Sequence, residues 1–489
     1  MNRLATRLPL LAAGLLAWAG AQGQESAPAR LVSATMFGAN VLSCEVGFYA
    51  GTLPEDAPGS RRREFAPLLA DHGIRLLRVP GGTLASEFIW DSEPATREIL
   101  RLEGSGYLSG YPDCHMYNYF TAVDQVARFC QATGTELIYQ LNAFTYRDDT
   151  GPHALALPLP EDQFPALRRL YAPDGLAAAT ESVRRLVGHV KELGLPVHYW
   201  EIGNEEYGYP RLDPLRYSQI ARSYVDAIRA EDPQAEVLVT LGDNQMLQAG
   251  SDWEAWSRAL LGDLRDQGYA DRIGHFTMHY SWRSVCEAGA RLLDEFGFTQ
   301  SRLAVTEFTC GWPEYWEATP RYRHAVLVAQ FLMDLLAVPR VDIACIHDLT
   351  SQNFGVFHYN MRSFGPPDDR SYDGALGYAP MPTATTYRLL KVLHGGRILS
   401  AGSDLVEVSH DGAYAAVACN AGDRPRTVVL RPQAYGLEAA ALAGELMTGE
   451  SPEATEAKVV AVQPVPEGDG FRLELPPLSV VALRTSAAP

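Results

Sequence analysis

The sequence predicts a (β/α)8 TIM barrel followed by a smaller β-sandwich, and two observations carry that prediction. Between about residues 31 and 398, eight short apolar runs alternate with longer segments of helical periodicity, as in parallel barrels whose strands are buried on both faces. After about residue 399 the pattern changes to short strand-like pieces separated by turn-forming residues. The chain of 489 residues is long enough for both domains.

The eight strand candidates are short apolar runs, several of which end in polar residues. They span residues 34–40, 76–80, 136–142, 198–202, 236–241, 275–280, 303–307 and 343–348. Segments with helical periodicity lie between them, at residues 116–132, 175–193, 214–231, 253–267, 321–337 and 383–393. A doubly wound open sheet is the alternative architecture. It would bring a phosphate-binding glycine fingerprint after the first strand, and Phe37-Gly38-Ala39-Asn40 does not supply one.

The C-terminal domain is predicted to span residues 399–489, which leaves residues 31–398 to the barrel. Its strand candidates lie at residues 405–409, 414–420, 426–430, 439–446, 458–465, 471–475 and 479–484. Turn-forming pairs such as Asp411-Gly412 and Thr448-Gly449 separate them, which is typical of an antiparallel sandwich packed on a barrel. An N-terminal strand near residues 28–35 is a candidate addition to this domain.

The first residues have the pattern of a targeting segment. Arg3 and Arg7 precede an apolar run over residues 8–19, and small residues follow at Ala19-Gly20-Ala21 or Ala21-Gln22-Gly23. Residues 1–23 are therefore expected to be a cleaved secretory signal peptide, which predicts a secreted or periplasmic protein. No later stretch approaches about 18 apolar residues, so no membrane association is expected.

Composition argues against several classes of partner. The formal net charge of −18 disfavours nucleic acid and anionic membranes, since both are bound through clustered Lys and Arg. The seven cysteines include no C-x-x-C pair, and most are expected to be small buried hydrophobes. Neither H-x-H nor H-E-x-x-H occurs, so no catalytic metal and no cofactor is expected. A metal-dependent barrel hydrolase is kept as an alternative.

Polar residues gather where the predicted strands end. In a barrel, the reactive groups lie at the carboxyl ends of the strands, where the β-to-α loops begin. Reading off those ends gives a polar ring of Asn40, Arg78, Asn142, Asn204 with Glu205, Asp243, His279 with Tyr280, Glu307, and His347 with Asp348. The active site is therefore expected at this end of the barrel.

Two glutamates in the ring follow the fourth and seventh predicted strands. Because these strands face each other across the barrel, Glu205 and Glu307 can converge on one bond. Hydrolysis of a glycosidic bond needs such a pair, with one carboxyl to protonate the leaving oxygen and one to attack or to activate water. The two carboxyls need different pKa values, and Asn204 and Tyr280 are candidates to supply the necessary contacts.

Several of these motifs resemble a known group of enzymes. Trp200-Glu201-Ile202-Gly203-Asn204-Glu205 and Val305-Thr306-Glu307-Phe308 resemble the two signatures of clan A glycoside hydrolases. Arg75-Leu76-Leu77-Arg78-Val79-Pro80-Gly81-Gly82, followed by Trp90-Asp91, is similar to the second-strand motif of family 51 α-L-arabinofuranosidases. Residues 137–142, 231–233 and 476–481 fit that family as well, so the resemblance covers both domains from about residue 31.

The resemblance implies a role for each matched position. It makes Glu205 the acid/base and Glu307 the nucleophile. It also makes Asn204 a hydrogen-bond partner of the sugar 2-hydroxyl and Arg78 a support for the nucleophile carboxylate. The implied mechanism is double displacement with retention, for which the two carboxyl groups are expected to lie about 5 to 5.5 Å apart.

Other residues of the ring are candidates to bind the substrate. His279 and Tyr280 fall at the sixth-strand His and Tyr of the family, but the usual one-residue spacer is missing, so either Tyr280 or Trp282 is expected to touch the nucleophile. Aromatic rings can stack on the faces of sugars, which makes Trp282 and Trp312 candidates. Asn142, at the end of the third strand, completes the set.

The first strand departs from the family pattern, which leaves the substrate open. The family has a sugar-binding glutamate after its first-strand glycine, whereas this chain has Asn40-Val41-Leu42-Ser43, and Thr83 replaces an Asn or Cys. The expected function is a secreted retaining glycoside hydrolase, α-L-arabinofuranosidase-like, acting on plant or microbial polysaccharide or oligosaccharide. The alternatives are a clan A hydrolase of xylosides or glucuronides, an endo-acting glycanase, and a non-catalytic carbohydrate-binding barrel.

Overall fold

Eight parallel strands close into a barrel in the computed structural model, which describes residues 30–41, 46–82, 85, 88–96, 121–143, 145–148, 151–154, 175–207, 212–243, 250–310, 321–351, 355–359 and 377–485. In chain order the barrel strands are β1 (Gly38–Asn40), β2 (Leu76–Val79), β3 (Glu136–Leu141), β6 (Tyr199–Ile202), β7 (Glu236–Asp243), β8 (His275–His279), β9 (Arg302–Phe308) and β10 (Val341–His347). Each predicted run overlaps one of these strands, although β7, β9 and β10 extend beyond the predicted bounds, and the predicted fold class is confirmed.

The first strand is shorter than predicted. Residues Ala34–Phe37 form a 3-10 helix (η1) in place of the first half of the expected strand. The Ser33 side chain accepts a hydrogen bond from the backbone N–H of Thr35, and the Thr35 hydroxyl donates to the carbonyl of Asp342 at 2.6 Å. These local bonds compete with the strand conformation, because Ser and Thr side chains satisfy nearby backbone groups.

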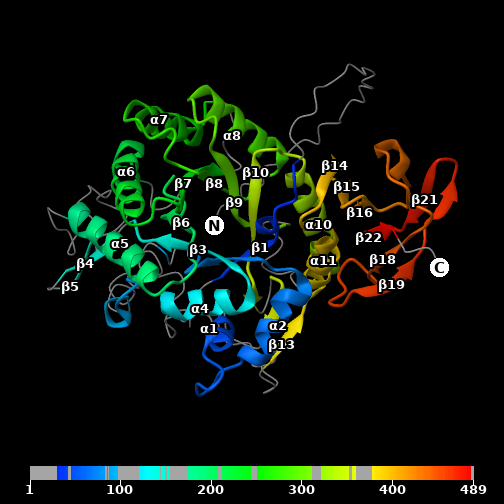
Figure 1. Cartoon of the computed structure of the whole chain (residues 1–489), viewed down its shortest axis with the longest axis horizontal. Coiled ribbons are helices and arrows are strands. Elements are labelled where there is room, and N and C mark those ends of the chain that lie inside the picture. Colours follow the sequence, from blue (N-terminus) through cyan, green and yellow to red (C-terminus); the bar gives the residue numbers. More distant parts are fainter. Residues whose placement is uncertain are drawn as a thin grey trace, which may run out of the picture.

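Helices surround the strands. They are α1 (Val46–Thr52), α2 (Arg62–His72), α4 (Val123–Thr133), α5 (Gly175–Glu192), α6 (Pro214–Glu231), α7 (Asp252–Asp266), α8 (Arg283–Glu295), α10 (Tyr322–Leu336) and α11 (Pro382–Leu390), which continues into η7 (Lys391–Leu393). Figure 1 shows this ring of helices around the barrel. The helix α6 begins as predicted, because Asp213 caps the N–H groups of Leu215 and Arg216 and Pro214 takes the first helical position.

Side chains inside the barrel lie in two layers of opposite character. The lower layer is apolar and contains Leu76, Ile138, Leu238, Ala304, Ile343 and Cys345. Side chains on a strand alternate between its two faces, so the residues two positions further along point the same way. At those positions the strands carry buried polar side chains, including Arg78, Gln140, Thr240 and Thr306. The polar layer therefore sits above the apolar one, toward the carboxyl ends of the strands.

The C-terminal region forms two antiparallel sheets, as predicted for a β-sandwich. The larger sheet has the order β14 (Arg397–Ala401), β15 (Leu405–His410), β16 (Ala413–Asn420), β22 (Ser479–Thr485), β18 (Leu442–Thr448) and β19 (Lys458–Val462). The smaller sheet has the order β17 (Arg426–Leu430), β21 (Gly470–Leu475) and β20 (Val465–Glu467). The strand β14 is an addition to the predicted set. The segment Arg30–Val32 runs beside it, with the N–H of Ile398 bonded to the carbonyl of Arg30.

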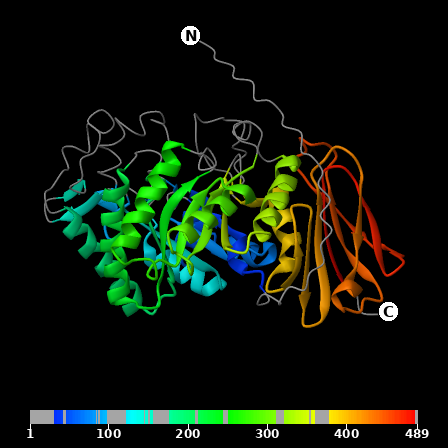
Figure 2. The same ribbon diagram turned by 90° about the horizontal axis from the view of Figure 1, so that it is seen from above.

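The larger C-terminal sheet is buried on both faces. One face meets the smaller sheet through a core that includes Tyr414, Ala416, Leu430, Phe471 and Val481. The opposite face joins the core of the barrel through Val406, Val408, Val417, Met447 and Val480. Figure 2 shows the C-terminal strands at one end of the molecule, directly beside the barrel helices.

Backbone groups at the start of α10 are satisfied by the C-terminal region. The N–H of Tyr322 donates to the carbonyl of Ala454 at 2.7 Å, and the N–H of Arg323 donates to the carbonyl of Pro452 at 3.0 Å. The first N–H groups of a helix have no partner within the helix. The Tyr322 hydroxyl also donates to the carbonyls of Met447 and Leu478, at 3.0 and 2.6 Å. The C-terminal loops therefore act as the cap of a barrel helix.

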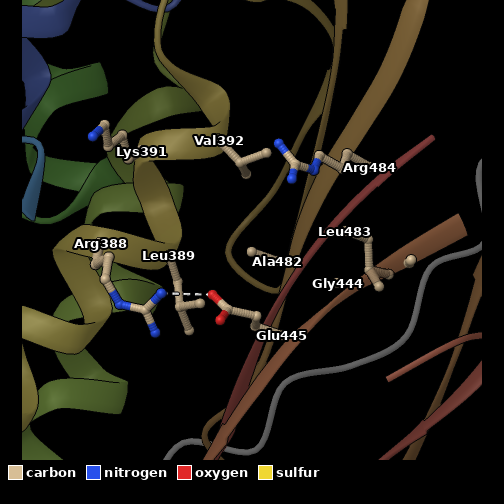
Figure 3. Close-up of a pocket in the computed structure, with 10 residues that line it drawn as sticks. Arg388, Leu389, Lys391, Val392, Gly444, Glu445, Ala482, Leu483 and Arg484 are labelled. Atoms are coloured by element: carbon tan, nitrogen blue, oxygen red, sulfur yellow. Dashed lines mark hydrogen bonds and ion pairs between the residues drawn. The ribbon is translucent and has the colours of Figure 1, made fainter. Parts of the chain in front are cut away.

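A cavity of about 580 Å³ lies where α11 meets the strands β18 and β22. Figure 3 shows Arg388 of α11 reaching Glu445 of β18, and the two side chains form an ion pair at 2.6 Å. The side chains of Lys391 and Arg484 line the same cavity. This junction is more polar than the apolar contact between the sheet and the barrel core, and it is accessible to solvent.

Smaller elements extend the loops at the carboxyl end of the barrel. The hairpin of β4 (Thr145–Asp148) and β5 (Gly151–Ala154) follows β3. A small sheet of β11 (Thr350–Ser351), β12 (Phe357–Tyr359) and β13 (Tyr378–Pro380) lies between β10 and α11 in the chain. The cysteines at positions 130, 286, 310, 345 and 419 are buried and free. Among the helices in the described ranges, none has the length and hydropathy needed to cross a bilayer.

Candidate active site

Arg78 is the centre of the polar layer, and its five N–H groups are all used. Nε donates to Glu201 at 2.6 Å, and Nη2 donates to Glu201 at 3.0 Å and to Asn204 at 2.9 Å. Nη1 donates to the side chains of Asn40 and Glu307, at 3.1 and 3.3 Å. A guanidinium has five N–H donors in a planar fork, so this set of acceptors matches its full capacity. One side chain on β2 thereby holds groups from β1, β6 and β9.

The ion pair between Arg78 and Glu201 is fully buried, with both side chains at 0% exposure. Burial alone would lower the pKa of the guanidinium, but the charge and the hydrogen bonds of Glu201, with the charge of Glu307, raise it. Arg78 therefore remains a cation. The hydroxyl of Thr306, on β9, donates to Glu201 at 3.0 Å and gives this carboxylate a further partner.

Glu307 lies at the end of β9 as a buried carboxylate surrounded by donors. Its Oε2 accepts from Asn40 at 3.2 Å and from Arg78 at 3.3 Å, and its Oε1 accepts from the Tyr280 hydroxyl at 2.7 Å. Burial raises the pKa of this carboxyl, but His347, His279 and Arg78, with the Tyr280 hydrogen bond, lower it well below its usual range. The structure therefore maintains Glu307 in its ionised form.

Tyr280, and not Trp282, is the aromatic residue that contacts Glu307. The backbone of Tyr280 turns sharply after β8, with φ at 49°, and its N–H donates to the carbonyl of Glu307 at 2.8 Å. This turn points the hydroxyl at the carboxylate without the usual one-residue spacer. Trp282 is the N-cap residue of α8 and packs edge-on against Phe331, with the ring centroids 4.6 Å apart. Its side chain is 38% exposed, so part of the ring faces solvent.

Glu205 lies beyond the end of β6 in a different environment. Its side chain is 31% exposed, and its Oε1 contacts Nδ1 of His279 at 2.8 Å and the hydroxyl of Tyr207 at 3.4 Å. The backbone of Glu205 has φ at 56°, a left-handed conformation that is uncommon for a residue with a Cβ. The two glutamates thus differ, because Glu307 is buried among donors and a cation while Glu205 is accessible and paired with an imidazole.

The hydrogen bonds around His279 define where its hydrogens lie. The hydroxyl of Thr306 donates its one hydrogen to Glu201, so it accepts from Nε2 of His279, which lies 3.1 Å away. Nε2 therefore carries a hydrogen, and Nδ1 shares one further proton with Glu205. Burial lowers the pKa of His279, but the hydrogen bond and the charge of Glu205 raise it overall. The side chains of His279 and Glu205 can therefore hold a proton between them.

Asn204 and Asn40 hold the remaining polar groups. Asn204 receives the Arg78 hydrogen bond through Oδ1, and Gln140 donates to the same oxygen at 3.5 Å. Asn40, in the neighbourhood that departs from the family pattern, donates both to Glu307 and to Nδ1 of His347, the latter at 2.8 Å. The first strand therefore contributes a support for Glu307.

The predicted substrate-binding residue Asn142 bonds to the loop after β2 and to α6. The side-chain amide of Asn142 donates to the carbonyl of Phe88 at 3.3 Å, and the Asn142 carbonyl accepts from the Tyr224 hydroxyl at 2.8 Å. Trp312 lies outside the described residues. The structure brings together Glu205, Glu307, Arg78, Asn204, His279 and Tyr280, whereas the ring of Trp282 packs against Phe331 on α10.

Sequence reasoning did not assign a role to Glu201, Glu206, Thr306 or Tyr207. Glu201 and Thr306 lie on the inward face of their strands and complete the network around Arg78. Strand alternation could have found Glu201, because it lies two residues beyond Tyr199, which packs against the apolar layer. Within the described residues, no group of three or more His, Cys, Asp or Glu side chains is arranged to hold a metal ion.

Comparison with solved structures places this architecture among barrel-and-sandwich proteins. A family 51 α-L-arabinofuranosidase from Bifidobacterium longum matches with a TM-score of 0.62 and 14% identity, over 94% of this chain and 97% of that one. The family 51 α-L-arabinofuranosidase of Thermotoga petrophila gives 0.61 and 15%, over 94% and 97%. A family 30 endoxylanase from Clostridium papyrosolvens gives 0.55 and 12%, over 94% and 98%.

Sequence comparison adds no further assignment. No protein-family model matches the chain, and no curated protein matches it. The structural likeness extends over nearly the whole chain of each of these glycoside hydrolases, although sequence identity is low. The class defined by the fold is thus a TIM barrel with a C-terminal β-sandwich, the architecture of these clan A hydrolases.

Proposed function

We propose that the protein is a secreted retaining glycoside hydrolase in which Glu307 is the nucleophile and Glu205 is the acid/base. The single observation that supports this most strongly is the contrast between the two carboxyls. Glu307 is kept ionised by Arg78 and by the Tyr280 hydroxyl, whereas Glu205 is accessible and shares a proton with His279. Because of such a difference in environment, one carboxyl can act as the nucleophile and the other as the acid/base.

In the first step, Glu307 attacks the anomeric carbon while the bond from that carbon to the leaving oxygen breaks. Glu205 transfers its proton to that oxygen, and a covalent glycosyl-enzyme forms. In the second step Glu205 removes a proton from water, the water oxygen bonds to the anomeric carbon, and the bond to Glu307 breaks. His279 supports both steps, because its Nδ1 lies 2.8 Å from Glu205 and can take or return the proton.

The proposed substrate is an α-L-arabinofuranoside within a plant or microbial glycan. One motif supports this choice, the strand-two sequence around Arg78, which resembles the motif of family 51 α-L-arabinofuranosidases. Trp282, two residues after Tyr280 and 38% exposed, is a candidate to stack on a sugar. A xyloside-acting or endo-acting specificity is the second candidate, because the family 30 endoxylanase shares the fold and the first-strand neighbourhood of Asn40 departs from the arabinofuranosidase pattern.

Kinetics on a panel of aryl glycosides would test the proposed activity. The panel contains arabinofuranosides, xylosides and glucuronides, and turnover of one class is expected from the wild type. Glu307→Ala is expected to abolish turnover, and a 2-fluoro glycoside of the active class is expected to label Glu307 in the wild type. Glu407→Gln, at a buried carboxylate of the C-terminal sheet, is the matched control and should leave turnover unchanged.

Two results would contradict the proposal. Turnover near the wild-type rate in Glu307→Ala would exclude Glu307 as the nucleophile. Binding of oligosaccharides without turnover of any aryl glycoside would favour the carbohydrate-binding barrel. Product analysis by NMR then separates retention from inversion, because a retaining enzyme releases the sugar first as the anomer it cleaved.

A further inference from the structure

The turn that carries Glu205 has an unusual backbone. Gly203 has φ at 76° and Glu205 has φ at 56°, so two left-handed residues flank Asn204 immediately after β6. A left-handed conformation is unfavourable for any residue with a Cβ, and it persists where surrounding contacts determine it. The contacts that fix this turn therefore also fix the direction of the Glu205 side chain.

Glu206 supplies those contacts with its own carboxyl group. The side chain is fully buried and folds back on the turn, so that Oε1 accepts from the backbone N–H of Asn204 at 2.5 Å. Oε2 accepts from the hydroxyl of Thr240, on the neighbouring strand β7, at 2.9 Å. A Cβ on Gly203 would lie 1.7 Å from Oε1, so the carboxyl occupies the space that only a glycine leaves. The carboxyl thus joins the turn to the barrel wall.

A carboxyl is an unfavourable group to bury at this position. The described donors to Glu206 are uncharged, namely the backbone N–H groups of Asn204 and of Glu206 itself and the Thr240 hydroxyl. The titratable groups that face it are Glu201 on β6 and Tyr217 on α6. Burial raises the pKa of Glu206 to about 7, although the Thr240 and backbone hydrogen bonds lower it. An apolar side chain would fill the space without this cost but would leave the Asn204 N–H without an acceptor.

We propose that Glu206 is a positioning residue that holds the Asn204–Glu205 turn in the geometry needed for proton transfer by Glu205. It touches no reacting atom, and it acts through the backbone of Asn204 and through Thr240. The inference rests on the proposed function, because it assigns Glu206 a part in acid/base catalysis by Glu205. Under this proposal, catalysis requires the correct backbone geometry of the turn in addition to the two catalytic glutamates.

Leaving-group dependence provides the test. A substrate with a good leaving group, such as a 2,4-dinitrophenyl glycoside, needs little protonation, whereas a 4-methoxyphenyl glycoside depends on Glu205. The parameter to compare is kcat/KM, because it reports the first step, whereas the second step uses Glu205 as a base with both substrates. Glu206→Leu is expected to lower kcat/KM on the poor leaving group by about tenfold or more and on the good one by less than about threefold. Glu206→Gln keeps an acceptor for Asn204 and is expected to restore most of the lost kcat/KM.

Glu407→Leu is the matched control, because Glu407 is also a buried carboxylate held by hydroxyl donors but lies in the C-terminal sheet. It should leave the ratio of the two rates unchanged. If Glu206→Leu does not fold, Thr240→Val, which removes the side-chain donor to Glu206, is expected to change the ratio in the same direction. Equal losses on both substrates in a folded variant would overturn the proposal.

Failure of the inference and failure of the proposed function give different results. If Glu206→Leu retains the wild-type ratio while Glu307→Ala is inactive, the inference fails and the proposed glycosidase stands. If the wild type turns over neither substrate, the proposed function itself fails for that glycoside class.

Discussion

At the scale of single residues, the site depends on matching donors to acceptors. Arg78 has five donors and contacts five acceptors, so a lysine at this position would leave several buried groups without partners. Leaving a buried polar group without a partner costs about 1–3 kcal/mol. The positions of Glu307 and Arg78 in the polar ring were predictable from their motifs, because polar side chains at the strand ends of a barrel point to the same mouth. Glu206 was not, because its role depends on a side chain that folds back on its own turn.

Tyr280→Phe is expected to shift the acidic limb of the pH profile. The Tyr280 hydroxyl is one of the groups that lower the pKa of Glu307, so its removal raises that pKa. The acidic limb of kcat/KM should then move to higher pH, and kcat should fall by about 10- to 100-fold. Tyr435→Phe removes a comparable hydroxyl from Glu407 and should leave the profile unchanged. If the acidic limb of kcat/KM does not move in Tyr280→Phe, that limb does not report the ionisation of Glu307.

Glu206→Gln is expected to change how stability depends on pH. Burial raises the folded-state pKa of Glu206 from 4.5 to about 7. The contribution of Glu206 to the free energy of unfolding is therefore present below about pH 4.5 and is lost as the pH rises to about 7. The loss is on the order of 3 kcal/mol. Urea unfolding at pH 5 and pH 8 should therefore show the variant gaining stability relative to the wild type at the higher pH. A difference that does not change with pH would contradict the raised pKa.

At the scale of elements, strand alternation and strand ends determine where side chains point. All eight barrel strands were predictable, because strands buried on both faces are largely apolar runs. The choice between Tyr280 and Trp282 was not, because it depends on the sharp turn with φ at 49° at Tyr280. Asn142 illustrates the same limit. The strand β3 ends at Leu141, and Asn142 then bonds to Phe88 in the loop after β2.

Gly203→Ala is expected to destabilise the protein more than Gly134→Ala. Gly203 and Gly134 both have positive φ, but a Cβ on Gly134 would meet nothing within 4 Å, whereas one on Gly203 would meet the Glu206 carboxyl. Gly134→Ala should cost about 1 kcal/mol from backbone strain. Gly203→Ala should cost at least about 1–3 kcal/mol more and should lower kcat. Equal losses of stability in urea titrations of the two variants would show that the turn can relax.

At the scale of the whole molecule, the C-terminal sheets are part of the support of the barrel. The division into a barrel and a β-sandwich was predictable from the change in pattern near residue 399. The contacts between them were not, because they join segments that lie far apart in sequence. Tyr322 shows this, since its hydroxyl reaches the carbonyl of Leu478, 156 positions further along the chain.

Tyr322→Phe is expected to weaken this junction without affecting the chemistry. The variant removes the donor to two carbonyls, those of Met447 and Leu478, and should lower the free energy of unfolding by about 1–3 kcal/mol. Arg388→Ala, which breaks the partly exposed ion pair with Glu445, should cost less than about 1 kcal/mol. Chemical denaturation measures both, and kcat should stay at the wild-type value. A larger effect from Arg388→Ala would reverse this ranking.

Because the larger C-terminal sheet packs against other elements on both faces, it limits where the chain can be truncated. A shortened gene that ends after η7 would encode a barrel whose helix α10 lacks its cap and whose outer wall exposes the apolar side chains that now meet Val406, Val417 and Met447. Such a product should precipitate when expressed. Fusion partners or affinity tags belong instead at the hairpin tip of Asp411 and Gly412, where the turn between β15 and β16 is exposed.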